Sequence, residues 1–274
     1  MEVHKVAGAL GAEVHGVDLS RALTSETIAG LRAAWLEHLV LLFRDQRLEP
    51  AHFLRFAHAL GKPMRYPLLD GLADFPEITE VKKLEHERAN FGGVWHSDTT
   101  YLQRPPMASM LYALEVPQFG GDTLFANQYL AFATLSSGMQ RVLQGLTAVN
   151  SSAKAEATKT REDRVRTQAR AEPSTQYAAE HPVVRTHPET GRKALYINVA
   201  HSVRFRDMTE DESAPLLAFL FQHQIRPEFT CRLRWQIGSL ALWDNRCALH
   251  NPVNDYHGQR RLMHRITLSG DEPR

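Results

Sequence analysis

From residue 62 to about residue 125, short apolar stretches alternate with prolines and glycines at intervals too short for helices. Such punctuation is typical of strands that are joined by turns. The last third of the chain is similar. Between residues 229 and 235, Phe, Cys, Leu and Trp alternate with Thr and Arg, as in an antiparallel strand with one solvated side. This pattern predicts a fold built mainly of β-strands.

Helical spacing of apolar residues is confined to a few segments. Helices are predicted over about residues 25–38, 50–61, 128–146 and 216–224. Further short strands are predicted at 12–17, 39–43, 194–199, 240–243 and 263–268. Many short strands with a few covering helices predict a jelly roll or a related barrel with flanking helices.

Charge and composition limit what the protein binds and where it works. The 32 Lys and Arg residues balance 31 Asp and Glu residues, so the chain lacks the strong positive charge expected of a protein that binds nucleic acid. There is no apolar stretch long enough to cross a membrane, no pattern of a signal peptide, and only two cysteines. We expect a single domain over residues 1–274, soluble and cytoplasmic, with neither nucleic acid nor a membrane as partner.

One segment differs in composition from the rest. Residues 151–181 carry eleven charged side chains of mixed sign, with only Val165 and Tyr177 as large apolar groups. Such a segment can bury little apolar surface. We therefore expect a mobile, solvated loop that acts as a lid.

The first chemical motif is a histidine and an aspartate two residues apart. On extended backbone, His96 and Asp98 point to the same side, as two ligands of one metal would. The same spacing occurs at His187 and Glu189, where Pro188 and nearby Gly191 indicate a solvated turn without function. A third ligand is required, and His250 ends a predicted strand late in the chain.

These residues leave more than one function open. Two histidines and a carboxylate on one face of a metal suit non-haem Fe(II) and the activation of O₂, but a hydrolytic zinc site uses the same residue types. Arg261 and Arg265 face the same way on a strand, and a guanidinium group can grip a carboxylate through two hydrogen bonds. The alternative for these arginines is a solvated strand edge. A barrel that keeps the site only for binding is the third alternative.

Five motifs occur along the chain, at residues 95–101, 120–125, 181–188, 243–246 and 250–265. In these motifs and in their order, the sequence resembles the taurine and aryloxyalkanoate dioxygenases, a family of Fe(II)- and 2-oxoglutarate-dependent oxygenases. The likeness extends from about residue 8 to residue 271. The resemblance implies a cupin-like double-stranded β-helix and a dioxygenase that releases succinate and CO₂ while it hydroxylates a small organic anion. A dimer or tetramer is also implied.

The resemblance also assigns roles to residues. It implies that His96, Asp98 and His250 bind Fe(II). Thr123 and Arg261 are expected to hold the distal carboxylate of 2-oxoglutarate. Arg265 would face the anionic group of the primary substrate or support the cosubstrate.

The sequence identifies the class of the primary substrate less precisely than it identifies the metal ligands. Tyr66, Leu69 and Gly92 occupy positions where the taurine enzymes contact their substrate, and their identities argue against taurine itself. An aryloxyalkanoate-type carboxylate is favoured, with alkylsulfonates and sulfate esters as alternatives. His201 is expected to line the pocket, the alternative being a surface histidine in a turn. Trp243, close to the ligands in sequence, is interpreted as a wall of the site or as ordinary core.

Overall fold

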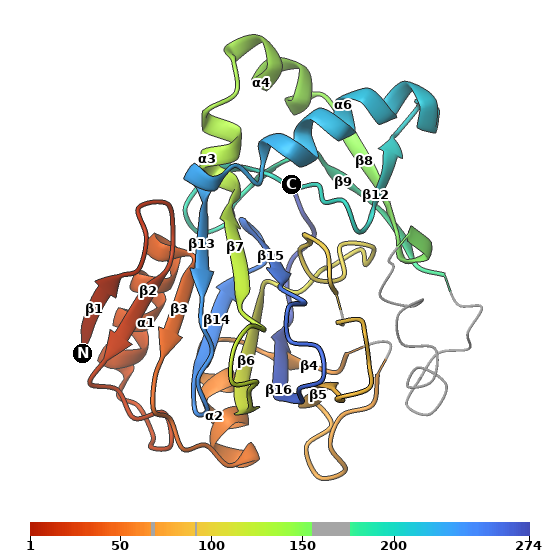
Figure 1. The fold of residues 1–274 in the computed structure, drawn as a ribbon. Coiled ribbons are helices and arrows are strands. Elements are labelled where there is room, and N and C mark those ends of the chain that lie inside the picture. The colour runs from red at the N-terminus through yellow and green to blue at the C-terminus, as the bar shows by residue number, and fades with distance from the viewer. Residues whose placement is uncertain (67–68, 91, 155–175) are drawn as a thin grey trace.

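The computed structural model describes residues 1–66, 69–90, 92–154 and 176–274. Within these residues, two sheets form the centre of the fold (Figure 1). The major sheet has the order β1 (Glu2–Lys5), β2 (Ala12–His15), β3 (Val40–Phe43), β14 (Leu240–Asp244), β6 (Ala108–Glu115), β16 (Arg261–Leu268) and β4 (Pro63–Met64), and β5 (Thr79–Lys83) also pairs with β16. The minor sheet has the order β13 (Thr230–Leu233), β7 (Thr123–Asn127) and β15 (Ala248–Pro252). Neighbouring strands in these two sheets pair antiparallel except β2 and β3, which are parallel. The two sheets form the predicted jelly roll, and the fold class is confirmed.

Strand β14 shows how the layers pack. Leu240 and Leu242 belong to the apolar cluster that packs against α1 (Ser25–His38) and α2 (Pro50–Leu60). Ala241 and Trp243 belong to a second cluster, which includes Phe125 of the minor sheet. Successive side chains of a strand point to opposite faces. The helices therefore cover the outer face of the major sheet, and the inner face packs against the minor sheet.

A third region lies at the top of the view in Figure 1, where α4 (Ser137–Gln144) and α6 (Glu210–His223) lie beside a small sheet. That sheet has the order β12 (Ser202–Phe205), β8 (Thr147–Ser151) and β9 (Ala178–Pro182). The remaining elements are α3 (Gln128–Ala133), the β10 (Val184–Thr186) and β11 (Lys193–Leu195) pair, and 3₁₀ turns at Ser152–Lys154 and Pro227–Phe229. The region has its own apolar cluster, which includes Leu217 and Leu220 of α6.

Helix boundaries differ from the sequence prediction where side chains cap the backbone. The single helix predicted over 128–146 is wrong, because Asn127 caps α3 while Ser136 accepts from the Met139 N–H and starts α4. The helix predicted over 216–224 begins earlier, at Glu210, because Thr209 caps its N-terminus. Ser, Thr and Asn at the N-cap satisfy backbone N–H groups that have no partner within the helix.

The segment predicted as a lid is described only at its ends. Residues 155–175 lie outside the described residues, whereas Ser152–Lys154 forms a 3₁₀ turn and Ala178–Pro182 forms β9 beside β8. The lid and the single domain over 1–274 stay predictions. Among the described helices, none combines the length and the apolar composition needed to cross a bilayer.

Candidate metal centre

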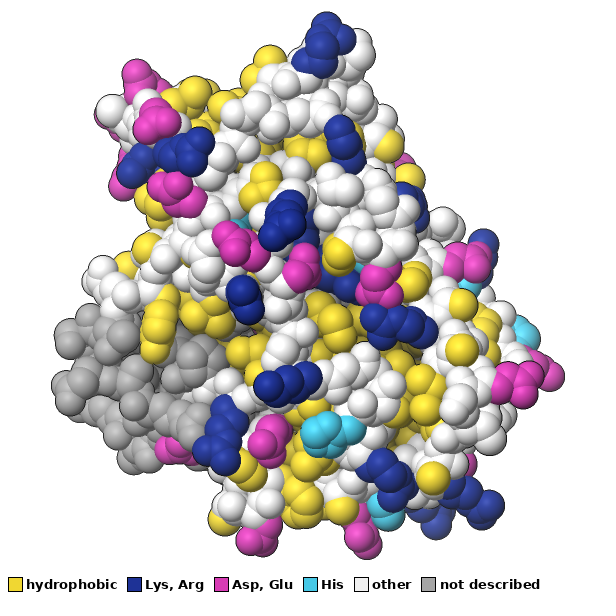
Figure 2. Space-filling view, turned by 180° about the vertical axis from the view of Figure 1, so that it is seen from behind, with side chains coloured by type: hydrophobic (Ala, Val, Ile, Leu, Met, Phe, Trp, Pro, Cys, Tyr) yellow, Lys and Arg dark blue, Asp and Glu magenta, His cyan; other side chains and the backbone are white. Residues whose placement is uncertain are grey.

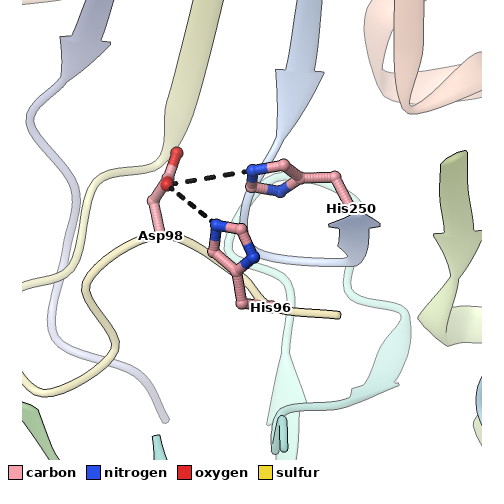
Figure 3. Close-up of side chains that lie close together, drawn as sticks. All are labelled: His96, Asp98 and His250. Carbon is pink, nitrogen blue, oxygen red and sulfur yellow. Dashed lines mark ion pairs between the residues drawn. The ribbon is translucent and has the colours of Figure 1, made fainter. Parts of the chain in front are cut away.

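Three side chains from two parts of the chain converge at the edge of the minor sheet, where His96 pairs with His250 of β15 (Figure 3). The backbone N–H of His96 donates to the carbonyl of His250 over 2.9 Å, and the N–H of His250 donates to the carbonyl of His96 over 2.8 Å. This bridge brings the two imidazole centroids to 4.1 Å. Asp98 Oδ1 lies 3.7 Å from His96 Nε2 and 3.9 Å from His250 Nε2. The structure thus brings the three predicted ligands together.

The donor atoms suit a divalent metal. His96 Nδ1 lies 2.7 Å from the carbonyl oxygen of Val94, to which it donates, so the Nε2 lone pair faces Asp98. A second hydrogen bond of this kind is the usual support of a metal-binding histidine. Two imidazole nitrogens and one carboxylate oxygen form the donor set of a facial triad. All three side chains are buried.

The electrostatics keep the three groups in their metal-binding protonation states. Burial lowers the pKa of His96, and burial together with the neighbouring His96 lowers the pKa of His250 to about 3. Burial by itself would raise the pKa of Asp98, but His250, Arg265 and His96 hold it below its usual value. At neutral pH the site therefore has two neutral imidazoles and one carboxylate, the forms that bind metal.

The backbone around the ligands is tightly constrained. Gly92 has φ +67°, and a Cβ at this position would lie 2.8 Å from His96 Cε1. Thr99, directly after Asp98, has φ +44°, which is rare for a β-branched residue. Unusual backbone at such positions is held by the surrounding contacts. Gly92 therefore packs against the predicted ligand His96, where a larger residue would displace the imidazole.

A pocket beside the triad contains the arginines that the sequence singled out. Its walls include His96, His250, Thr123, Trp235, Arg261 and Arg265. The two arginines, four residues apart on β16, face the same side as predicted. They are buried rather than placed on a solvated strand edge.

Arg261 is a buried guanidinium with two nitrogen atoms that lack a partner in the described part of the chain. It is 4% exposed, and its Nε and Nη2 have no hydrogen-bond partner among the described residues. Its guanidinium carbon lies 5.6 Å from the ring centre of Trp235. The indole N–H of Trp235 donates to Thr123 Oγ1 over 2.9 Å. Because a buried charge with unfilled hydrogen bonds is costly, an anion at this position would stabilise the site.

Arg265 lies between the metal centre and the predicted substrate residues. Its Nη1 is 3.8 Å from Asp98 Oδ1, and its guanidinium carbon is 4.1 Å from the ring centre of Tyr66. Burial would lower the pKa of Arg265, but Tyr66 and Asp98 raise it. Leu69, the next described residue after Tyr66, is also buried.

His201 is not a surface residue, because its side chain is buried and its ring centre lies 6.3 Å from that of His96. Asn198 Nδ2 donates to Thr100 Oγ1, and this oxygen also lies 2.9 Å from His201 Nδ1, within hydrogen-bond distance. Burial, with the neighbouring His96, lowers the pKa of His201 to about 3. His201 is therefore a neutral imidazole at neutral pH.

The prediction that His187 belongs to a solvated connection is wrong. His187 is 1% exposed, with Nε2 3.1 Å from Asp244 Oδ2. Glu189 pairs with Arg32 at 2.8 Å and with the buried Arg246 at 2.7 Å. A buried guanidinium requires carboxylate partners. Proline and glycine marked the turn correctly, and Pro188, Glu189 and Gly191 are exposed, but only the tertiary structure reveals that His187 points inward.

The sequence analysis missed two side chains that contact predicted site residues, Trp235 and Ser109, and a third, Asn245, that contacts Ser109. Trp235 belongs to a predicted alternating strand, where the sequence does not mark it as a site residue, but its indole N–H donates to Thr123 Oγ1. Ser109 donates to Asp98 Oδ2, and Asn245 donates to Ser109. Asn245 lies inside a quoted motif, which was the only available signal. Trp243 was noted, and its ring lies 4.8 Å from that of His250, centre to centre.

Comparison with known proteins decides the family. The family model described as "Taurine catabolism dioxygenase TauD, TfdA family" matches residues 2–267. The chain belongs to this family. It is thus a non-haem dioxygenase that uses Fe(II), 2-oxoglutarate and O₂, and the prediction of this enzyme class is confirmed.

Relatives in the family differ in their substrates. The alpha-ketoglutarate-dependent sulfate ester dioxygenase of Pseudomonas putida is 36% identical over 100% of this chain and 91% of its own length. The alpha-ketoglutarate-dependent 2,4-dichlorophenoxyacetate dioxygenase of Cupriavidus pinatubonensis is 32% identical over 95% of this chain and 94% of its own length. The crystal structure of a taurine dioxygenase from Burkholderia xenovorans superposes with a TM-score of 0.83, at 34% identity over 99% of this chain and 90% of that chain.

Proposed function

We propose that this enzyme hydroxylates a small organic anion at a C–H bond, with Fe(II) held by His96, Asp98 and His250. The observation that carries the proposal is the pocket in which both histidines face two buried arginines. When bound, Fe(II), 2-oxoglutarate and O₂ supply an oxidative decarboxylation that yields succinate and CO₂ and delivers one oxygen atom to the substrate. The chain itself supplies binding, orientation and exclusion of water.

The distal carboxylate of 2-oxoglutarate is assigned to Arg261 and Thr123. The Nε and Nη2 atoms of Arg261 offer two parallel donors, and such a fork matches the two oxygens of a carboxylate. Thr123 accepts from Trp235 and keeps its own hydroxyl proton for an acceptor in the pocket. The pair would fix the far end of the cosubstrate while its 2-oxo acid end faces the metal.

Arg265 is proposed to bind the anionic group of the primary substrate or to support the cosubstrate. Tyr66 packs on its guanidinium, and we place Tyr66, Leu69 and His201 around the substrate. Gly92 leaves space at the His96 ring because it has no side chain. Water exclusion strengthens the attraction between a buried guanidinium and an anion.

Recognition of the anion is local in this proposal. On the face shown in Figure 2, Lys and Arg side chains are interspersed with Asp and Glu side chains, in keeping with a net charge of +1. A surface of this kind provides no long-range attraction for anions. The selectivity for a negatively charged substrate would therefore come from the buried arginines.

Two substrate types have specific support. The motif resemblance favours an aryloxyalkanoate-type carboxylate, and the Pseudomonas putida relative favours a sulfate ester. Succinate release measured against a panel of aryloxyalkanoates, alkylsulfonates and sulfate esters would identify the substrate class. We expect one class to accelerate succinate release, and Arg265→Gln to raise the KM for that class by tenfold or more. An equal rate for anionic and uncharged analogues would contradict the proposal.

Arg260 provides a matched control for Arg265→Gln. Its side chain is 41% exposed and pairs with Glu115 at 2.8 Å, so it belongs to the same strand region but not to the pocket. Exposed ion pairs contribute little. Arg260→Gln is therefore expected to leave the KM unchanged.

The remaining predictions concern assembly and compartment. We propose a homodimer or homotetramer, which light scattering coupled to size-exclusion chromatography would measure. We also propose a cytoplasmic location. Cys231 and Cys247 are both free and buried, which agrees with a reducing compartment.

A further inference from the structure

A chain of side-chain hydrogen bonds runs behind Asp98. Trp243 Nε1 lies 3.0 Å from Asn245 Oδ1, and Asn245 Nδ2 lies 2.9 Å from Ser109 Oγ. Ser109 Oγ in turn donates to Asp98 Oδ2. All four side chains are buried, with Ser109 at 0% and Asn245 at 1% exposure. This series of hydrogen bonds begins at Trp243, whose indole packs on the predicted ligand His250, and ends at the predicted ligand Asp98.

The direction of every hydrogen bond in this chain is determined by its neighbour. An indole N–H can only donate, so the atom of Asn245 that faces Trp243 must be its carbonyl oxygen. The amide nitrogen of Asn245 then faces Ser109 and donates to it. With its oxygen accepting from Asn245, the Ser109 hydroxyl directs its single proton to Asp98 Oδ2. The chain therefore delivers a hydrogen bond to one chosen oxygen of the carboxylate.

The other oxygen of Asp98 faces the ligands. Oδ1 is the atom that lies 3.7 Å from His96 Nε2 and 3.9 Å from His250 Nε2. A carboxylate can bind a metal through one oxygen or both. A facial triad needs one oxygen only, because a second would occupy a position that the cosubstrate or O₂ requires.

We propose that Asn245 is a positioning residue that restricts Asp98 to a single metal-binding oxygen. Through Ser109, it holds Oδ2 away from the metal and leaves Oδ1 as the ligand. The inference rests on the proposed function, since it assumes that Asp98 binds the metal. It adds a role for the third residue of the motif that begins at Trp243.

The backbone of Asn245 is anchored independently of its side chain. Its N–H donates to the carbonyl of Met107 over 2.9 Å, and its carbonyl accepts from Ser97 Oγ over 2.6 Å. In the pairing of β14 with β6, Trp243 lies opposite Ser109. A change of the Asn245 side chain therefore leaves several contacts that keep the segment in place. The carboxamide can be tested without removing the strand pairing.

The decisive variants are Asn245→Asp and Ser109→Ala. Asp at 245 keeps the shape of the side chain but has no N–H for Ser109, so the serine proton turns toward residue 245 and away from Asp98. Ser109→Ala removes the donor to Asp98 directly. We expect either variant to weaken Mn(II) binding in the absence of O₂ by about tenfold or more, the usual effect of losing a hydrogen bond to a ligand. Mn(II) affinity is read by electron paramagnetic resonance, without turnover.

Matched controls separate this role from a structural one. Asn150 is also 0% exposed and accepts from Ser202 Oγ over 2.8 Å, so Asn150→Asp measures the cost of altering a buried asparagine elsewhere. We expect Asn150→Asp to change Mn(II) affinity by less than twofold. We also expect the double variant Ser109→Ala/Asn245→Asp to bind Mn(II) as tightly as the single variant with the lower affinity, because both residues act through one hydrogen bond.

Mn(II) affinity that is unchanged in both single variants, or losses that add in the double variant, would overturn the positioning role. Asp98→Ala distinguishes this failure from failure of the proposed function. If Asp98→Ala abolishes Mn(II) binding while Asn245→Asp and Ser109→Ala bind normally, the positioning role of Asn245 is wrong and the proposed metal site is supported. If Asp98→Ala binds Mn(II) as tightly as the native enzyme, both the proposed metal site and the positioning role of Asn245 are wrong. Thermal unfolding of each variant verifies that the fold is kept.

Discussion

The indole N–H of Trp235 donates to the hydroxyl oxygen of Thr123 over 2.9 Å, beside the buried guanidinium of Arg261. This contact leaves the Thr123 proton free for an acceptor in the pocket. We predict that Trp235→Phe raises the KM for 2-oxoglutarate by about fivefold, because one hydrogen bond of about 1 kcal/mol loses its orientation. Succinate formation at varied 2-oxoglutarate measures this KM, and an unchanged value in Trp235→Phe would contradict the role of the indole.

Arg261 is predicted to matter more than any other residue for cosubstrate binding. Arg261→Gln removes the charge and one arm of the donor fork, and we expect 2-oxoglutarate binding to weaken by about a hundredfold, a loss of about 3 kcal/mol. Calorimetric titration of the anaerobic Mn(II) enzyme with 2-oxoglutarate measures the affinity. Arg260→Gln, on the adjacent exposed side chain, should bind normally. Equal effects of the two substitutions would show that Arg261 has no special role.

Gly92 is predicted to protect the position of the His96 ring. Gly92→Ala would place a Cβ 2.8 Å from His96 Cε1 on backbone with φ +67°. We expect a stability loss of about 1 kcal/mol from the backbone conformation and a tenfold weaker Fe(II) affinity from the displaced ring. Gly93 is the control, since its Cβ would have no neighbour closer than 3.6 Å. Metal affinity that falls equally in both alanine variants would contradict this account.

His201 gives a prediction about pH. Burial, together with His96, lowers its pKa from 6.5 to about 3, so the unfolded chain binds a proton at His201 below pH 6.5 while the folded enzyme does not. The contribution of His201 to stability is therefore complete above pH 6.5 and is lost as the pH falls toward 3, at no more than about 1.4 kcal/mol per pH unit.

This pH effect is measured by denaturant unfolding of the metal-free enzyme between pH 4 and pH 8. We expect His201→Gln to lose less stability than the native enzyme as the pH falls through this range. Parallel stability curves for the two proteins would mean that His201 takes up its proton equally in the folded and unfolded states.

The parts of the site that lie in local motifs could be predicted from the sequence. His96 and Asp98 are two residues apart on one segment, and the spacing of Arg261 and Arg265 fixes their common face on a strand. Period-two alternation and the Pro and Gly positions were sufficient for the jelly-roll class. These features depend on residues that are close together in the sequence, so the sequence alone is sufficient to predict them.

Features that depend on register between distant strands could not be predicted. Asn245 reaches Ser109 because β6 pairs with β14 in a register that places Trp243 opposite Ser109, and no local pattern encodes that pairing. His187 is buried because Asp244, far along the chain, lies beside it. The break between α3 and α4 is different, because it has a local signal. Ser136 is a favoured N-cap residue, but the helical spacing of apolar residues continues across it and predicts one helix.

The central claim is that His96, Asp98 and His250 bind Fe(II) for a reaction driven by 2-oxoglutarate. The most direct test is to add Fe(II) and 2-oxoglutarate to the metal-free enzyme without O₂, record the visible spectrum, and then admit O₂ with substrate. We predict a weak charge-transfer band that decays as succinate forms, and no band in His96→Ala. A native enzyme without the band, or a band that persists in His96→Ala, would contradict the account.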